Sequence, residues 1–117
     1  MTFGVGGGTG AGMSSRIIEK LSSEFRKKVI LTFPVFHAEE MKELPLYSYN
    51  EVFSYATCVE SCKKVIIDNS RIFEMTGSKK QDNYSKMNKM IVNVMSDITS
   101  TFRLGQGMIH SNLTEFE

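Results

Sequence analysis

The chain has 117 residues and a mass of 13.2 kDa, the size of one domain or of part of a larger one. Its 41% apolar and 23% charged residues exclude a disordered tail, and no apolar run approaches the ~20 residues that span a bilayer. A formal net charge of +1 argues against a protein that binds nucleic acid or anionic membranes through an excess of basic residues.

The cysteines and histidines predict no metal site. Cys58 and Cys62 lie four residues apart, whereas the two histidines, His37 and His110, are remote in sequence. We therefore expect no Cys/His zinc cluster, and we expect reduced thiols in the cytoplasm. The first ten residues carry neither a basic segment nor an apolar core, so we expect no secretory signal.

The chain opens with a glycine-rich segment that precedes an amphipathic one. Residues 4–12 read GVGGGTGAG and hold six of the nine glycines, which predicts a loop. Apolar residues then recur at helical spacing and predict a helix over about residues 13–27; they are Ile17, Ile18, Leu21 and Phe25.

Two short apolar segments predict strands. Residues 29–36 (VILTFPVF) and 63–68 (KKVIID) are typical of strands that are buried on both faces. Pro34 donates no hydrogen bond to a neighbouring strand, so we expect the first strand to fray or bulge there.

Helices and loops fill the remainder of the chain. They are a loop over 37–49, a helix over 50–61, a short helix over 69–76, a loop over 77–82, a long helix over 83–103, a loop over 104–111 and the start of a helix over 112–117. Asn50 is the expected N-cap of the helix over 50–61. The side chains of that helix expected to face inward are Val52, Phe53, Ala56 and either Val59 or Tyr55. The long helix carries an unbroken apolar stripe that predicts a core-facing helix, made of Met87, Met90, Ile91, Val94, Met95, Ile98 and Phe102.

Helices that alternate with apolar strands predict an α/β fold with a parallel sheet. Two strands are too few for such a sheet, and no strand is predicted before the glycine-rich loop, although a phosphate-binding loop normally follows one. We therefore expect residues 1–117 to form part of a larger α/β domain, with no second domain.

The glycine-rich loop before a helix predicts a phosphate site, and three interpretations compete for it. A Walker A loop fails because Met13 stands where that loop needs its lysine. Gly6, Gly8 and Ala11 fit a loose dinucleotide fingerprint, but no acidic residue stands at the expected offset of ~20 residues. The longer string GGGTGAG resembles the phosphate-binding signature of the superfamily of tubulins and bacterial cell-division GTPases.

The resemblance to tubulins continues in order along the chain. The segments EKLSSEFRKK, VILTFPVF, YSYNEVF, VIIDNSRIFEM, DNYSKMNKMIV and SDITSTFRLGQG are similar to successive tubulin elements, and SNLTEFE is similar to the α type. The resemblance implies a Rossmann-type GTPase domain with parallel strands and a long central helix. The chain then corresponds to the second half of the nucleotide-binding domain plus that helix.

The resemblance also implies the binding residues. The glycine-rich loop cradles the phosphates of GTP through Gly6, Gly7, Gly8, Thr9 and Gly10. Asn69 matches the residue that binds the nucleoside, although an N-cap role after a strand explains an asparagine there equally well. Tyr84 matches the aromatic residue that stacks on guanine and Asn88 the amide that binds its edge; positions four apart share a helix face.

The implied catalytic residue is Glu115, which matches the acid that acts on the nucleotide of a neighbouring subunit. The chain departs from the family pattern at Gly4, usually a serine, at Tyr47, usually an acid, and at Asn112, which replaces an aspartate. Mg²⁺ is the implied metal, and its ligands are expected outside this chain.

The resulting prediction is a GTP-binding subunit of microtubules in the cytoplasmic cytoskeleton, which hydrolyses GTP on head-to-tail assembly with another tubulin subunit. Neither nucleic acid nor membrane is an expected partner. Two alternatives stay open: a degenerate tubulin relative that acts only as a structural or capping subunit, and part of a dinucleotide-binding oxidoreductase.

Overall fold

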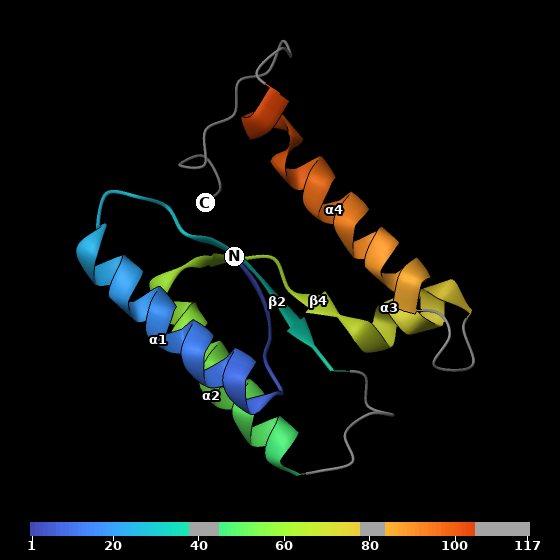
Figure 1. Ribbon diagram of the computed structural model, residues 1–117, viewed down its shortest axis with the longest axis horizontal. Helices are drawn as coiled ribbons and strands as arrows, with labels where there is room; N and C mark the ends of the chain where they lie inside the picture. The colour runs from blue at the N-terminus through green and yellow to red at the C-terminus, as the bar shows by residue number, and fades with distance from the viewer. Residues whose placement is uncertain (38–44, 78–83, 105–117) are drawn as a thin grey trace.

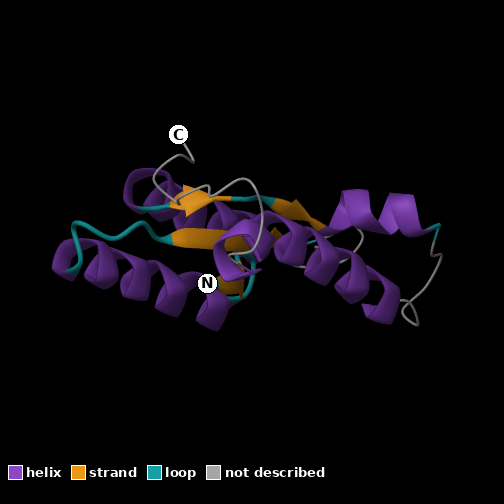
Figure 2. Cartoon of the chain, turned by 90° about the horizontal axis from the view of Figure 1, so that it is seen from above, coloured by secondary structure: helices purple, strands orange, loops and turns teal. Residues whose placement is uncertain are grey.

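The structure is a computed structural model that describes residues 1–37, 45–77 and 84–104. It confirms an α/β fold with a parallel sheet. The elements in chain order are β1 (Thr2–Gly4), α1 (Gly8–Glu24), β2 (Leu31–Phe36), α2 (Leu46–Ser61), β3 (Lys63–Lys64), β4 (Ile67–Asp68), α3 (Asn69–Thr76) and α4 (Tyr84–Leu104). The strands lie at the centre of the chain, with α1 and α2 toward one end of its long axis and α3 and α4 toward the other (Figures 1 and 2).

The sheet is parallel in every described pair. β2 lies in the middle, with β1 on one side and β3 and β4 on the other. Gly4 pairs with Val35, and Phe36 pairs with Asp68, so the carboxyl ends of β1, β2 and β4 meet at one edge of the sheet. In a parallel sheet this is the edge where ligands bind.

A strand does precede the glycine-rich loop, so the prediction that none does is wrong. β1 is joined to β2 by hydrogen bonds from Phe33 N to Met1 O (2.8 Å) and from Val5 N to Val35 O (3.1 Å). The three residues of β1, of which the last is a glycine, carry no strand pattern of their own. They form a strand because they pair with β2. The sheet accordingly has more than the two strands expected.

The loop predicted over residues 4–12 is also too long, because α1 begins at Gly8. The glycines at 8, 10 and 12 form the first turns of the helix rather than a loop. Glycine in a helix costs about 0.5–1 kcal/mol relative to alanine, and packing of this turn against β1 offsets that cost.

Pro34 lies inside β2 without ending or bulging it, contrary to the expectation. It pairs with Phe3 and is fully buried. The carbonyl oxygen of Thr32 accepts from Val65 N at 2.9 Å. Because residues two apart in a strand face the same neighbouring strand, the nitrogen of Pro34, which has no hydrogen to donate, also faces the segment of β3 and β4. The single strand predicted over 63–68 is broken into β3 and β4 at this point, while the register on either side of the gap is the same.

The small core lies between the sheet and the pair α1 and α2, which pack side by side (Figure 1). Its buried residues are Phe3, Val5, Ile18 and Cys58. The predicted inward face of α2 is wrong: Val52 and Phe53 are 67% and 70% exposed, and Ala56 is exposed, whereas Tyr55 is half-buried.

The buried face of α2 carries Glu51, Ser54 and Cys58 instead. These side chains are small or hydrogen-bonded, which lets α2 approach α1 and the glycine-rich loop closely. The side chain of Val59 lies outside the described residues.

The helix predicted over residues 69–76 is confirmed as α3. It ends at Gly77, whose φ of 64° is in the left-handed region that favours glycine.

α4 confirms the long helix over about 83–103, but of the stripe predicted to face the core only Met87 is buried. α4 packs mainly on α3 and reaches β1 where Thr2 Oγ1 donates to Met95 Sδ (3.9 Å), so most of its apolar stripe is only half-buried. No helix within the described ranges is long and apolar enough to cross a membrane.

Candidate functional site

Three segments of the chain converge at the carboxyl edge of the sheet. β1 leads into the glycine-rich loop, β2 leads into His37, and β4 leads into Asn69. Adjacent strands lie about 4.8 Å apart, so β1 and β4 are separated by about 10 Å across β2. The structure thus brings the predicted phosphate-binding loop and the predicted nucleoside-binding residue to one edge, at a distance that a nucleotide can bridge.

The phosphate side of the candidate site is the open N-terminus of α1. Gly7 is the N-cap without a side-chain hydrogen bond, and the first intrahelical bond runs from Ala11 N to Gly7 O (2.9 Å). The amides of Gly8, Thr9 and Gly10 therefore have no acceptor within the helix. No acidic residue lies in the first turn, and both Gly8 and Thr9 are exposed. Free amides at the positive end of a 17-residue helix make an anion site.

The backbone approaches closely at two glycines behind this N-terminus. A Cβ at Gly10 would meet the carbonyl oxygen of Gly4, so only glycine lets the first turn of α1 lie directly on β1. A Cβ at Gly6 would lie 2.6 Å from Nδ1 of His37. Around Gly7 and Gly8, in contrast, nothing lies within 4 Å of the added Cβ. Gly6 and Gly10 thus allow close packing of the glycine-rich segment on its neighbours, and Gly7 and Gly8 leave space for a ligand.

The structure adds Asn50 and His37, which the sequence did not indicate as part of this site, and places them beside Tyr47, which the resemblance marks as a departure from an acid. Asn50 donates from Nδ2 to Gly6 O at 3.0 Å, instead of capping α2 as predicted; the helix begins earlier, at Leu46, with Pro45 as N-cap. The ring of His37 lies 5.0 Å from that of Tyr47, centroid to centroid, and both contact the Gly6 position.

Glu51 completes this support of the glycine-rich loop. Its Oε1 accepts from His37 N at 3.2 Å, and Glu51 is 6% exposed. These residues come from α2 and from the end of β2, so no local pattern in the sequence links them to the loop, from which Asn50 is 44 residues away.

Asn69 is not the N-cap of α3, the structural role that could also have explained an asparagine at this position. The N-cap of α3 is Asp68, whose Oδ1 accepts from Ser70 N at 2.8 Å. The Oδ1 atom of Asn69 is buried and has no hydrogen-bond partner in the described structure. A buried carbonyl oxygen without a partner costs about 1–3 kcal/mol, so a ligand that donates to it would be favoured.

Tyr84 and Asn88 lie one turn apart at the start of α4, and both are exposed. Their position is determined by α3, on which α4 packs, whereas the glycine-rich loop is held by β1 and α2. The two halves of the predicted site are therefore supported by different elements. Glu115 lies outside the described residues.

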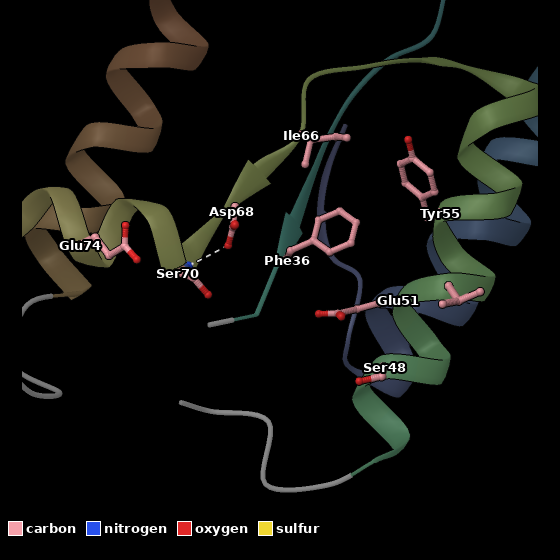
Figure 3. Close-up of a pocket in the computed structure, with 9 residues that line it drawn as sticks. Phe36, Ser48, Glu51, Tyr55, Ile66, Asp68, Ser70 and Glu74 are labelled. Atoms are coloured by element: carbon pink, nitrogen blue, oxygen red, sulfur yellow. Dashed lines mark hydrogen bonds between the residues drawn. The ribbon is translucent and has the colours of Figure 1, made fainter. Parts of the chain in front are cut away.

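A groove of about 720 Å³ lies beside this site, between α2 and α3 (Figure 3). Glu51 extends into it from α2 and Asp68 and Glu74 from the opposite wall, with Phe36 between them. Three carboxylates oppose a bound triphosphate, and neither the glycine-rich loop nor Tyr84 and Asn88 line the groove. The phosphates of a nucleotide would therefore lie at the α1 N-terminus and not in this groove.

The described ranges contain no group of three or more His, Cys, Asp or Glu side chains that could hold a metal ion. The groups described at this site suit the binding of a ligand: free amides for an anion, an unpartnered amide oxygen for a donor, and an exposed aromatic ring.

A parallel sheet whose first strand runs through a glycine-rich loop into an open helix N-terminus defines the class of Rossmann-type nucleotide-binding folds. Residues 1–77 match the model of the Tubulin/FtsZ family, GTPase domain. The chain belongs to this family.

Its relatives include α- and γ-tubulins. It is 35% identical over 116 residues to tubulin alpha-8 chain of Caenorhabditis elegans, covering 96% of this chain and 25% of that protein. It is 31% identical over 120 residues to tubulin alpha-1 chain of Saccharomyces cerevisiae (99% and 27%) and 32% identical over 111 residues to tubulin gamma chain of Eremothecium gossypii (92% and 23%). The chain thus spans about a quarter of the length of these relatives.

Proposed function

We propose that the chain is a GTP-binding subunit of the tubulin type. The observation that carries this proposal is the open N-terminus of α1, backed by the close approaches at Gly6 and Gly10, in a chain of the Tubulin/FtsZ family. Gly6, Gly7, Gly8, Thr9 and Gly10 would hold the phosphates through main-chain amides and the Thr9 hydroxyl. The chain would form the second half of the nucleotide-binding domain and the central helix.

The nucleoside would be held from the other side of the sheet edge. The unpartnered Oδ1 of Asn69 would accept a hydrogen bond from the nucleoside, Tyr84 would stack on the base, and Asn88 would bind the base edge. Stacking and edge recognition on one helix face give selectivity for guanine as well as affinity. Mg²⁺, when bound with the phosphates, would neutralise their charge, and its ligands are expected outside this chain.

Hydrolysis would depend on assembly with another tubulin subunit, head to tail in a cytoskeletal filament in the cytoplasm. Glu115 would orient or deprotonate the attacking water at the nucleotide of the neighbour. α4 has 21 residues, so about 30 Å of helix separate Tyr84 from the segment that carries Glu115, which favours action on a second subunit over action on its own. Asn112 in place of an acid favours a second candidate, a relative that binds GTP and serves only as a structural or capping subunit.

Nucleotide selectivity tests the binding proposal. In the intact protein, Tyr84→Ala should weaken GTP binding by about 1–3 kcal/mol, as the loss of aromatic stacking on a base does. Asn88→Ala should reduce the preference for GTP over ATP, measured by competition calorimetry, and the exposed Asn93→Ala on the same helix serves as the control. Unchanged affinity and preference in both variants would refute the site.

The rate of GTP hydrolysis distinguishes the two candidate functions, a subunit that hydrolyses GTP on assembly and a structural or capping subunit. In a polymerising protein, Glu115→Ala should leave the Kd for GTP unchanged and slow assembly-dependent hydrolysis by a factor on the order of 10² or more. Hydrolysis that is negligible before mutation would instead favour the structural or capping subunit. Loss of GTP binding with intact turnover per bound nucleotide would contradict the role of Glu115.

A further inference from the structure

A second cavity lies at the amino-terminal edge of the strands, opposite the candidate nucleotide site. It has a volume of about 660 Å³ and lies between the link from α1 to β2 and the link from α2 to β3. Lys63 N donates to Ile30 O at 2.9 Å, and Leu31 pairs with Lys63 in the sheet. The two walls are therefore held at a fixed separation by main-chain bonds.

Positive charge is concentrated around this cavity. Arg26 and Lys28 line one wall and Lys63 and Lys64 the other, four of the fourteen Lys and Arg residues in the chain, against Glu60 as the one lining acid out of thirteen. The whole chain has a net charge of only +1, so this local excess is not a property of the average surface.

Three of the four cations of the cavity are available to a ligand. The fourth, Lys64, has its Nζ 5.4 Å from the centre of the ring of Tyr55, a residue that lines the groove between α2 and α3 instead. Arg26, Lys28 and Lys63 take part in none of the ion pairs of the described residues, whereas Arg16 and Lys20 on α1 are paired with Glu19 and Glu24. The C-terminal ends of α1 and α2 nearby each carry only a fraction of a negative charge, which leaves most of this positive charge uncompensated.

A thiol lies in the wall of the same cavity and can report on its occupancy. Cys62 is half-buried and lines the cavity; its Sγ donates to Cys58 O at 3.3 Å and lies 3.3 Å from Thr32 Oγ1. Cys58 is fully buried, and burial, together with the neighbouring Cys62, raises its pKa to about 11. At neutral pH Cys58 therefore stays a protected thiol, and alkylation reports on Cys62.

We propose that this cavity binds a small multivalent anion of the polyphosphate class. One exposed ion pair contributes little, so binding requires an anion with several negative groups that contacts cations on both walls at once. A linear polyphosphate has this property, and the volume of the cavity accommodates one. The site is independent of the proposed GTP site, which lies at the other edge of the sheet and uses main-chain amides.

The test uses the intact protein and inorganic tripolyphosphate. Saturating tripolyphosphate should slow alkylation of Cys62 by iodoacetamide, measured by peptide mass spectrometry, with Cys58 as the unreactive internal reference. The double variant Arg26→Gln, Lys63→Gln should weaken protection about tenfold or more, because both walls lose a charge-assisted contact. The matched control is Arg16→Gln, Lys20→Gln, which removes the same charge from α1 outside the cavity and should retain protection. Circular dichroism of each variant checks that the helices are intact.

Three results would overturn the proposal. Tripolyphosphate could fail to protect Cys62, which would mean that the cavity holds no such anion. Equal loss of protection in both double variants would mean that the effect depends on the overall charge of the protein and not on the cavity. Protection by polyglutamate but not by tripolyphosphate would assign the cavity to an acidic protein segment instead.

Discussion

The side chain of Asn50 donates a hydrogen bond from Nδ2 to the main-chain carbonyl of Gly6 at 3.0 Å. This bond ties α2 to the glycine-rich loop across 44 residues of sequence. Because Gly6 is followed directly by the N-cap of α1, the bond also fixes the direction in which the free amides of Gly8 and Thr9 point. Asn50 therefore acts on the proposed phosphate site as a positioning residue.

Removal of this bond should weaken phosphate binding more than it destabilises the fold. We expect Asn50→Ala to lower the free energy of unfolding by about 1 kcal/mol, the net contribution of one hydrogen bond, and to raise the Kd for GTP in addition. Denaturant titration and calorimetry measure the two effects. Asn93→Ala, an exposed asparagine on α4, should change neither. An unchanged Kd for Asn50→Ala would refute the positioning role.

Two glycines of the loop should respond in opposite ways to substitution by alanine. Gly10→Ala places a methyl group against the carbonyl oxygen of Gly4, so it should separate α1 from β1 and lower the free energy of unfolding by about 1–3 kcal/mol. Gly8→Ala meets nothing within 4 Å and should leave the unfolding transition unchanged or raise it by up to about 1 kcal/mol. In the GTP-bound protein, however, the methyl group at position 8 should oppose close approach of a phosphate and raise the Kd. Equal stability of both variants would contradict the packing described here.

The space at Gly4 predicts a gain of affinity by substitution. A Cβ there would lie 3.7 Å from Cε1 of His37, an ordinary van der Waals contact, so a serine is accommodated. Gly4→Ser adds a hydroxyl donor at the end of β1, and we expect tighter GTP binding by about 0.5–1.5 kcal/mol. Gly4→Ala fills the same space without a donor and is the matched control. A gain that alanine reproduces would come from backbone entropy and not from a new hydrogen bond.

The surface of the chain predicts low stability when the 117 residues are isolated. The solvent-accessible area is 8523 Å², compared with about 6,400 Å² for a compact protein of this mass. Leu46, Val52 and Phe53 on α2 are all more than 60% exposed. We expect a broad, weakly cooperative thermal transition and strong binding of an apolar dye; a sharp transition of monomeric material would contradict this.

Local sequence patterns correctly predicted the helices whose structure depends mainly on their own residues. The helix over 69–76 has the bounds predicted and ends before Gly77 as expected, but its N-cap is Asp68 and not Asn69, the residue that the sequence offered for that role. The amphipathic stretches likewise predicted α1, α2 and α4, although α1 and α2 begin earlier than predicted and α1 ends at Glu24 instead of residue 27. The predicted loop residues Gly6 to Gly10 and the predicted Asn69 do meet at one edge of the sheet.

The errors arise where a distant segment decides the structure. The strand at Thr2–Gly4 exists because it pairs with β2, and its three residues carry no alternation to detect. On α2, hydrophobicity favoured Val52 and Phe53 as the inner face, but Glu51 and Asn50 face inward because their partners, His37 N and Gly6 O, lie there. Such contacts between residues far apart in the chain are not encoded in any local period.

The gap opposite Pro34 makes the two ends of the proposed nucleotide site differ in rigidity. The phosphate end is held by three consecutive pairs of β1 with β2 and by the Asn50 bond. Asn69, at the base end, follows a segment that joins the sheet through only two pairs beyond the gap. Ordering this looser segment costs conformational entropy that the phosphate end does not incur. A triphosphate would therefore meet a more rigid part of the site than its base would, and phosphate binding and base recognition would depend on different parts of the chain.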